Sequence, residues 1–434
     1  TPSLRELHNY KEENIDLPLI ILFGDHHYSR ENMCPNCDCD EKSCCYEIYH
    51  TDFLKELDKI AKSFPIDFYT EFSPTRINAY QNSSSGILFY NFIQHTIKDC
   101  HNVPLRSLPN YKQKCPTQYI RWHYTDTRWL NNVIEGYILS SFYTYINIWP
   151  TKRLNIEDII KGYTQWKVNQ RSRFSSLDNQ GKEITIKILN TLFDDFTSDI
   201  ILINLVNVII DSILLKSNQG VKSAIIKQIN KLQSQKLQNI KLWKEIAIQS
   251  LSEAPKLTSN LSHLKKIPNQ QSLKLFFISI LNNDLSDISS LESIHKTNLL
   301  KTIIYTSSLL GTLNTILLDL YCVLRMLKNP DNNIHPILSL GFFGDTHTRS
   351  IVKILSHPLI NYNIQIIKQP KNNVSRCITF SDKINLYNDI IQHARFLYSN
   401  NPQKLKLYQN QIYKEQKSRH PNKNIPNWNK TWNW

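Results

Sequence analysis

The chain has 434 residues, of which 41% are hydrophobic and 20% are charged, and this composition excludes an intrinsically disordered protein. A single core is unusual at this length, so we expect two subdomains or one α/β domain with a large insertion. The 51 Lys and Arg against 37 Asp and Glu give a formal net charge of +14, which favours a polyanionic partner or an acidic substrate. No glycine-rich phosphate-binding loop occurs, so we expect no nucleotide cofactor.

The most informative stretch lies near the start of the chain. An apolar run over 19–23 stops at Gly24 and is followed by Asp25, His26 and His27. A short run of Ile, Leu and Phe is typical of a parallel strand covered on both faces, and glycine permits a sharp exit from it. Polar residues directly after such an exit are placed to line a crevice.

The same order of residues recurs late in the chain. The apolar run 337–343 leads to Gly344, Asp345 and His347, and a helix is expected over 348–356. One such motif alone would most simply be a surface turn, but two copies favour a site. Ligands bind at the carboxyl ends of the strands in open α/β sheets. We therefore predict that the strands ending at Gly24 and Gly344 are parallel members of one sheet and share a crevice.

The segment 66–72 is the second predicted strand, and an amphipathic helix over 52–63 connects it to the first. Strand, helix and strand joined in this way form a βαβ unit, so the two strands should be parallel and, most simply, neighbours. Glu71 then lies at the same edge of the sheet as His27. A lone glutamate near a strand end is usually solvated, whereas this one is predicted to face histidines.

Residues 118–128 alternate in character, which predicts a further strand. Arg121 and His123 share one face, while Asp126 and Arg128 share the other face or lie in the following loop. We identify His123 as a candidate metal ligand, and Arg121 or Arg128 as a candidate to hold a developing oxyanion. The alternative is an edge strand whose charges form salt bridges.

From 129 to 328 the pattern is helical almost throughout, with breaks at 217–220 and Pro255. The predicted fold class is α/β, with a mostly parallel sheet built from N- and C-terminal βαβ units and a large all-helical insertion. We expect an N-terminal α/β part over 1–128 with a cysteine-rich loop over 33–46, a helical insertion over 129–333, a C-terminal α/β part over 334–400 that completes the sheet, and a basic, aromatic tail over 401–434.

The last helix of the insertion, 299–327, leads into the second Gly-Asp-x-His strand. Residues three positions apart lie near one face of a helix, which groups Asp319, Cys322 and Arg325. These polar groups could brace the site at the end of that strand.

Membrane insertion is not expected from the sequence. The most apolar stretch, 199–216, is interrupted by Asn204, Asn207 and Asp211, so we interpret it as a core helix rather than a transmembrane segment. The polar, charged N-terminus predicts no signal peptide.

Five cysteines crowd into twelve residues just after the first Gly-Asp-x-His motif. Thiolates on a short loop can bind one zinc ion, and disulfides would indicate an oxidising compartment. Free thiols are the third alternative, and the spacing does not decide among the three. We predict at least one disulfide or metal bond among them. The five, which form a candidate second metal site, are Cys34, Cys37, Cys39, Cys44 and Cys45.

The tail after Pro402 interleaves Lys and Arg with Tyr and Trp. Charge and aromatic stacking together could bind a polyanion. The simpler interpretation is a helix followed by a docking or disordered terminus.

The order Gly24-x-x-His27, Glu71 and Gly344-x-x-His347 resembles the Tiki/TraB and erythromycin-esterase/ChaN superfamily. In that superfamily such turns and the glutamate build the active site. The resemblance implies a metal-dependent protease or other hydrolase, and one branch of the superfamily is linked to haem. The cysteine-rich loop and the helical insertion depart from the core pattern.

A wider set of motifs resembles uncharacterised proteins of large DNA viruses. This resemblance implies virion association as one location of a protein for which the sequence predicts no transmembrane segment. The set adds Arg121-x-His123-Tyr124-x-Asp126-x-Arg128 and Asp319-x-Tyr321 to the second Gly-Asp-x-His motif.

The leading functional hypothesis is a metal-dependent hydrolase of peptide or ester bonds. Histidine and carboxylate side chains at facing strand ends suit a divalent ion such as Mn²⁺, Zn²⁺ or Co²⁺. Glu71 would be a ligand or general base, and a metal-free variant makes His27 the base, oriented by Glu71. The alternative is a virion structural or interaction protein, assembling with itself, on a degenerate hydrolase-like fold. The candidate ligands are Asp25, His26, His27, Glu71, His123, Asp345 and His347.

Overall fold

The computed structural model describes residues 18–25, 57–70, 119–125, 157, 160–161, 164–165, 179–193, 198–215, 226–232, 236–252, 255–282, 295–328, 336–360, 362, 402–403, 406 and 409–410. Several sequence predictions fall outside these residues. They are the predictions for His26, His27, Glu71, Arg128, the cysteine-rich loop and most of the basic tail.

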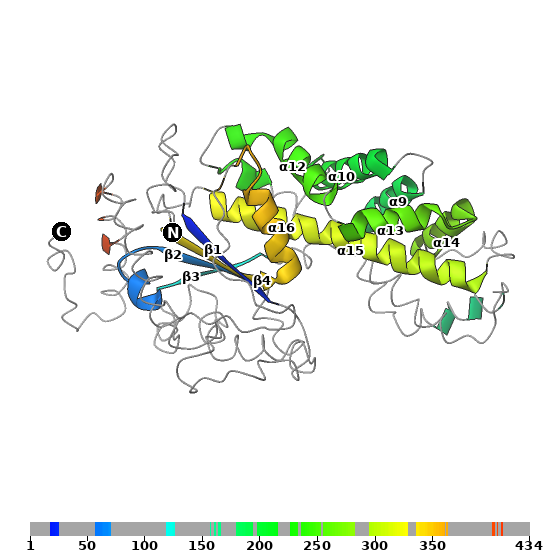
Figure 1. Cartoon of the computed structure of the whole chain (residues 1–434), viewed down its shortest axis with the longest axis horizontal. Coiled ribbons are helices and arrows are strands. Elements are labelled where there is room, and N and C mark those ends of the chain that lie inside the picture. Colours follow the sequence, from blue (N-terminus) through cyan, green and yellow to red (C-terminus); the bar gives the residue numbers. More distant parts are fainter. Residues whose placement is uncertain are drawn as a thin grey trace.

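A four-stranded parallel sheet combines three strands from the first part of the chain with one strand from the last part, in the order β1-β4-β2-β3 (Figure 1). The strands are β1 (Leu19–Asp25), β2 (Ile66–Thr70), β3 (Arg121–Tyr124) and β4 (Leu338–Gly344). β1 and β4 pair along their whole length, from Leu19 opposite Leu338 to Asp25 opposite Gly344. The predicted α/β class is confirmed, as is the prediction that these two strands are parallel members of one sheet.

The strand order corrects one prediction. β1 and β2 are parallel, as expected, but they are not neighbours, because β4 lies between them and pairs with both. β4 is buried along its whole length, and such an apolar strand suits the centre of a parallel sheet. A βαβ connection fixes the direction of two strands, but it does not prevent a strand from the far end of the chain from inserting.

The two faces of the sheet differ in what they carry. Side chains alternate along each strand, so residues paired across strands point the same way. The buried side chains on one face are mostly apolar, such as Phe68 of β2 and Leu340 of β4, with Thr70 as a buried polar residue at the end of β2. On the other face Tyr69 and Phe343 join the hydrophobic cluster of α15 (Lys296–Leu327) and α16 (Asp345–Leu355). Asp67, Arg121 and His123 lie on this second face.

A helical region lies between β3 and β4, as predicted. Its described elements are α9 (Asn179–Leu192), α10 (Ser198–Leu215), the short 3-10 helix η5 (Lys236–Gln238), α12 (Ile240–Ser252), α13 (Pro255–Lys265), α14 (Gln270–Asn282) and α15. α15 runs from these helices to the sheet (Figure 1). The predicted break at Pro255 falls at the first residue of α13, where proline is tolerated because its missing N–H needs no partner.

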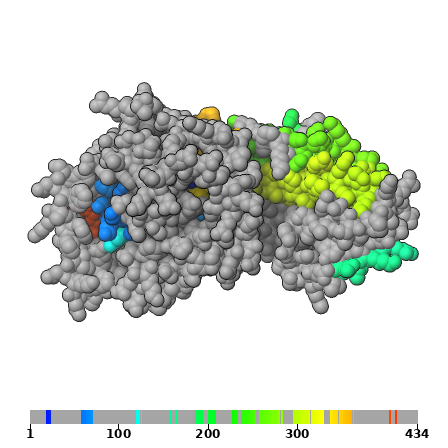
Figure 2. Space-filling view, turned by 60° about the horizontal axis from the view of Figure 1, so that its bottom comes forward, coloured from blue at the N-terminus to red at the C-terminus, as the bar shows by residue number. Residues whose placement is uncertain are grey.

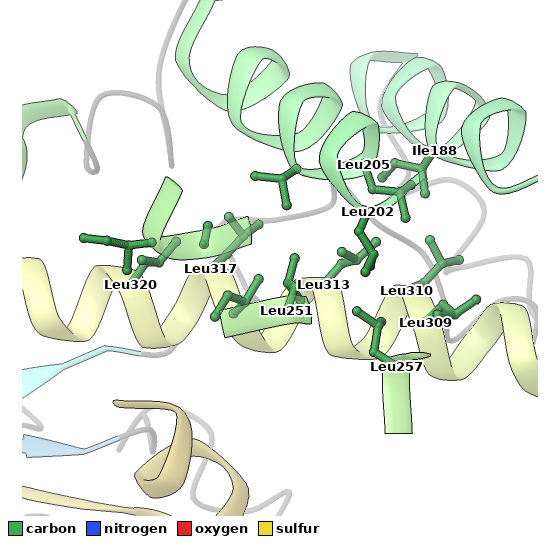
Figure 3. Close-up of a cluster of buried hydrophobic side chains, with 14 of the residues drawn as sticks. Ile188, Leu202, Leu205, Leu251, Leu257, Leu309, Leu310, Leu313, Leu317 and Leu320 are labelled. Atoms are coloured by element: carbon green, nitrogen blue, oxygen red, sulfur yellow. The ribbon is translucent and has the colours of Figure 1, made fainter. Parts of the chain in front are cut away.

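The core of the helical region is built along α15. Leucines at 309, 310, 313, 317 and 320 follow the three- and four-residue spacing of one helix face, and all are buried. Figure 3 shows these leucines together with Leu202 and Leu205 of α10 and Ile188 of α9. Burial of an apolar stripe of this kind is the main source of helix stability in proteins.

α15 is the one helix within the described ranges that is long and apolar enough to cross a membrane, judged by length and composition. Of its most apolar stretch, 71% is buried inside the fold. Figure 2 shows its yellow-green surface beside the green surfaces of neighbouring helices. The stretch 199–216, predicted to be a core helix, forms α10, in which Ile201, Leu202 and Leu205 are buried.

Gly341 marks a close approach inside the sheet. A Cβ atom at this position would lie 2.5 Å from Cε2 of Phe343 and 2.6 Å from Cδ2 of Leu22. Both side chains pack into the cluster between the sheet and the helices, so they have little room to move. We expect Gly341→Ala to lower the free energy of unfolding by about 1–3 kcal/mol, measured by urea denaturation.

Gly311 in α15 provides the matched control. It is exposed, and a Cβ atom there would have no heavy atom within 4 Å. Gly311→Ala should stabilise the protein by about 0.5–1 kcal/mol, because alanine has the higher helix propensity. A similar change in both variants would contradict the packing at Gly341.

Candidate functional site

The carboxyl ends of three strands meet at one edge of the sheet. Asp25 of β1 pairs with Gly344 of β4, and Thr70 of β2 pairs with Phe342 on the other side of β4. Glu71 is the residue after Thr70 in the sequence, and His27 follows Asp25 by two residues. The backbone therefore brings the segments that carry the predicted site to one edge. The side chains of Asp25, His26, His27, Glu71 and Asp345 lie outside the described part of the structure.

The second Gly-Asp-x-His motif is a direct junction between β4 and α16. The helix begins at Asp345 rather than at 348 as predicted, so His347 lies in its first turn. Gly344 caps this helix with φ −58° and ψ 149°, values that any residue can adopt, so the expected need for glycine does not arise from its backbone conformation. Thr348 donates a hydrogen bond of 3.3 Å to the main-chain oxygen of Phe23, which joins α16 to β1.

His347 is held by a carboxylate from α15. Its Nδ1 lies 2.7 Å from Oδ1 of Asp319, whose side chain is fully buried. In a neutral imidazole that donates from Nδ1, the lone pair is on Nε2. An oriented Nε2 of this kind is what a metal ligand or a general base requires. The prediction that Asp319 braces the second motif agrees with this contact.

A second polar group of residues, which we call the Asp67 cluster, lies on the same face of the sheet. Asp67 is buried in β2. Arg121 donates from Nε to Oδ1 of Asp67, and Nε2 of His123 lies 3.2 Å from the same oxygen. Tyr69 donates to Oδ2 of Asp67 at 3.3 Å. The cluster consists of Asp67, Tyr69, Arg121, His123, Tyr321 and Arg325.

Arg325 joins the cluster from the last turn of α15. Its Nη2 lies 2.7 Å from Nδ1 of His123, and its Nη1 donates to the hydroxyl of Tyr321 at 3.0 Å. Arginine offers only donors, so Nδ1 of His123 is the acceptor and its ring proton lies on Nε2, toward Asp67. The hydroxyl of Tyr69 also lies 3.1 Å from the main-chain oxygen of Arg325. The end of α15 is thereby attached to both β2 and β3.

Burial and pairing together set the charges in the Asp67 cluster. Burial alone would raise the pKa of Asp67, but Arg121 and His123 hold that pKa far below its ordinary value. Burial lowers the pKa of His123, and the charges of Arg325 and Arg121 lower it further against the pull of Asp67. Burial and the charge of Asp67 raise the pKa of Tyr69. At neutral pH, Asp67 is therefore ionised while His123 and Tyr69 are neutral.

These shifts predict a loss of stability in acid. Below about pH 6.5 the unfolded chain takes up a proton at His123 that the folded chain resists, so stability falls as the pH falls toward the lowered pKa. Asp67 adds a second loss below about pH 4 for the same reason. Urea denaturation of the wild type and of His123→Gln from pH 8 to pH 4 should show that the variant lacks the upper part of this dependence. Parallel pH profiles would show that His123 is not buried in its neutral form.

The Asp67 cluster is separate from the Asp319–His347 pair. Asp67 and Arg121 are in register with Ser339, which precedes Gly344 by five residues, or about 16 Å along a strand. Arg325 follows Asp319 by six residues, or about 9 Å along α15. The structure therefore brings Arg121 and His123 to Asp67 rather than to His347. This arrangement corresponds to the salt-bridged alternative for β3, and the roles of Arg121 in oxyanion binding and of His123 in metal binding stay predictions.

The donor set bears on whether a metal could bind at the edge. Within the described ranges, no group of three or more His, Cys, Asp or Glu side chains is arranged to hold an ion. The Asp319–His347 pair nevertheless fits the periphery of a metal site, where a carboxylate accepts from one nitrogen of a ligand histidine. The further protein ligands that the sequence predicts are the residues at the ends of β1, β2 and β4.

Asp67 and Tyr69 are the residues that sequence reasoning missed. The available signal was Asp67, an acid within a predicted strand. Asp67, Tyr69 and Glu71 occupy alternate positions, and alternate positions of a strand share a face. Only Glu71 was identified from the sequence. The contact between His123 and Arg325 joins residues 202 positions apart, and no local pattern could indicate it.

No family model, curated protein or solved structure matches this chain. The resemblance to the Tiki/TraB and erythromycin-esterase/ChaN superfamily therefore stays a prediction from short motifs. The functional proposal rests on the geometry of the strand ends and of His347.

Proposed function

We propose that this protein is a hydrolase of peptide or ester bonds whose site lies at the carboxyl edge of β1, β4 and β2. The observation that carries the proposal is the Asp319–His347 contact at the point where β4 passes into α16. It is supported by the register of β1 and β4, in which Asp25 lies opposite Gly344, so that the starts of both Gly-Asp-x-His motifs lie within one residue of each other. Glu71 follows directly from the strand on the other side of β4.

His347 has a defined chemical role in this proposal. Its Nδ1 bond to Asp319 holds the ring and favours the tautomer with the lone pair on Nε2. Nε2 can then take a proton from water during attack on a carbonyl carbon, or it can bind a divalent ion. A bound Mn²⁺, Zn²⁺ or Co²⁺ would supply a Lewis acid and a water of lowered pKa. The residues proposed to complete such a site are Asp25, His26, His27, Glu71 and Asp345.

The proposal is tested by an assay of the full chain on chromogenic esters and peptides. The protein is loaded with Mn²⁺, Zn²⁺ or Co²⁺ in turn, and each preparation is repeated after chelation. We expect hydrolysis that His347→Ala reduces by about 100-fold or more, because a positioned acid–base group contributes at least that much. His357→Ala is the matched control, because His357 lies just beyond the same helix and, among the described residues, its side chain accepts a hydrogen bond from the main-chain N–H of its near neighbour Leu359. Equal rates in the His347→Ala variant and the wild type would overturn the proposal.

A structural or interaction role on the same fold is the second candidate. The Asp67 cluster favours it, because two of the predicted site residues, Arg121 and His123, bind other cluster residues: Arg121 binds Asp67 of β2, and His123 attaches Arg325 of α15 to the sheet. In a virion component, such a polar network would fix the fold without chemistry. Tight self-association of the purified chain, with no hydrolysis under any metal condition, would support this candidate over the first.

A further inference from the structure

Arg325 is a half-buried cation whose bonded partners are neutral. Its side chain donates to the hydroxyl of Tyr321 and to Nδ1 of His123, and its guanidinium carbon lies 5.7 Å from the centre of the Tyr321 ring. Burial lowers the pKa of His123, so this imidazole is neutral at neutral pH and can accept a hydrogen bond from Arg325. Neither partner supplies the negative charge that a half-buried guanidinium ordinarily requires.

The acid closest to Arg325 in the Asp67 cluster is already engaged. Asp67 accepts from Nε of Arg121 through Oδ1 and from Tyr69 through Oδ2. Within the part of the chain that the structure describes, Arg325 forms no ion pair with a carboxylate. The positive charge of Arg325 can therefore attract an anion from outside the cluster.

The donors of Arg325 are not used up. A guanidinium carries five N–H donors, and the two contacts to Tyr321 and His123 use one each. Nε of Arg325 is buried and has no hydrogen-bond partner among the described residues. The hydroxyl of Ser339 is also buried without such a partner, and Ser339 is in register with Asp67 on the strand between β1 and β2. Buried polar atoms of this kind usually have a ligand or water as partner.

Solvent can approach this region from the β3 side of the sheet. The side chain of Arg121 is 28% exposed and that of His123 is 20% exposed. β3 is also the last strand of the described sheet on that side. A ligand therefore need not pass through the hydrophobic core of the helical region to reach Arg325.

We propose that Arg325 is the centre of a binding site for an oxyanion, a carboxylate or a phosphate group of a small molecule. The planar fork of an arginine side chain matches the oxygen atoms of both groups. The hydroxyl of Tyr321 accepts from Arg325 and keeps its own hydrogen as a further donor. The positive net charge of the chain favours the approach of such a ligand.

The anion site does not depend on the hydrolase proposal. If the protein both binds an anion at Arg325 and hydrolyses a substrate at His347, that substrate carries an acidic group. Arg325 and Asp319 are about 9 Å apart along α15, at 1.5 Å per residue. The Asp67 cluster and the end of β4 are about 16 Å apart along the sheet, so a substrate bound by Arg325 and hydrolysed at His347 would be elongated, with its acidic group remote from the scissile bond. Binding is measured without turnover, so failure of one proposal leaves the other open to its own test.

The test uses the full chain and two probes, sodium phosphate and sodium succinate, against sodium chloride at equal ionic strength. Thermal unfolding and titration calorimetry should show saturable binding of at least one probe by the wild type. Arg325→Gln should weaken that binding by about tenfold or more, the value of a charge-assisted hydrogen bond. Arg349→Gln changes an exposed arginine on α16 and should bind like the wild type. Binding of phosphate alone identifies a phosphoryl ligand, and binding of succinate alone identifies a carboxylate.

Two results would overturn this site: no saturable binding of either probe by the wild type, or equal affinity in Arg325→Gln. Should Arg325→Gln fail to fold, the test uses the NMR signal of Arg325 in the wild type. Arg325→Lys keeps the charge but lacks this signal, so comparison of the two spectra identifies it. The ¹⁵N resonance of Nε in Arg325 should then shift in a saturable way as phosphate or succinate is added. A resonance that does not respond to either probe would show that Arg325 is only a structural bridge between α15 and β3.

Discussion

Replacement of Asp67 by asparagine should lower the free energy of unfolding by about 3 kcal/mol, at the lower end of the range for breaking a buried ion pair. Asp67 is buried, and its carboxylate is the common partner of Arg121, His123 and Tyr69. The neutral amide would leave the guanidinium of Arg121 without this counter-charge. The lower end of the range applies because the side chain of Arg121 is 28% exposed and water can replace part of the lost interaction.

The control for this prediction is an aspartate without burial. Asp199 lies exposed in the first turn of α10, where a negative charge is favourable to the helix terminus. Asp199→Asn should cost about 0.3–1 kcal/mol. Urea denaturation at pH 7 measures both variants, and the acid-dependent loss below about pH 4 should be smaller in Asp67→Asn than in the wild type. If the two variants lost the same stability, the Asp67 cluster would not hold α15 to the sheet.

Replacement of Asp319 by asparagine should affect function more than stability. The amide keeps the shape of the side chain but removes the negative charge that holds Nδ1–H of His347. Substitution of a carboxylate that orients a ligand histidine typically costs about 10–100-fold in metal affinity or activity. A neutral hydrogen bond can still form, so we expect a loss of stability of only about 1–2 kcal/mol. His347→Ala is less specific, because it leaves the fully buried Asp319 without its histidine partner.

Asp319→Asn and Asp67→Asn therefore form a pair with opposite signatures. Below its unfolding temperature, the Asp67→Asn variant should keep most of the hydrolysis of the wild type and its pH profile. The Asp319→Asn variant should remain folded at that temperature but hydrolyse slowly, with an altered pH profile. The result that would count against the proposed site is wild-type hydrolysis in Asp319→Asn, because His347 would then not depend on its carboxylate.

The sheet could be predicted from the sequence because its signals are local. The apolar runs before Gly24 and Gly344 indicate buried strands, and both form strands of the same sheet. Their repeated ending predicted a shared edge. The position of β4 between β1 and β2 could not be predicted, because neither βαβ unit contains information on which strand lies at the centre.

The candidate site was predictable only in part. Alternation along β3 correctly placed Arg121 and His123 on one face, but it did not reveal which acid they bind. Helical spacing grouped Asp319 with Cys322 and Arg325. The helix that carries them is the element before β4 in the chain, which indicated that Asp319 could reach the end of that strand. Arg325 was grouped with Asp319, yet it reaches His123 because α15 continues past the carboxyl edge and across the face of the sheet. Such contacts depend on the packing of whole elements, which spacing in the sequence does not encode.

Anomalous diffraction from crystals of the full chain loaded with Mn²⁺ tests most directly whether both Gly-Asp-x-His motifs and Glu71 form one site. Mn²⁺ prefers oxygen and imidazole ligands over thiolates, so the cysteine-rich loop should not compete. We predict an anomalous peak at about 2.0–2.3 Å from Nε2 of His347, with side chains of His27 and Glu71 within roughly 4–6 Å of that nitrogen. His27 and Glu71 lying remote from His347, with no peak between them, would contradict the account.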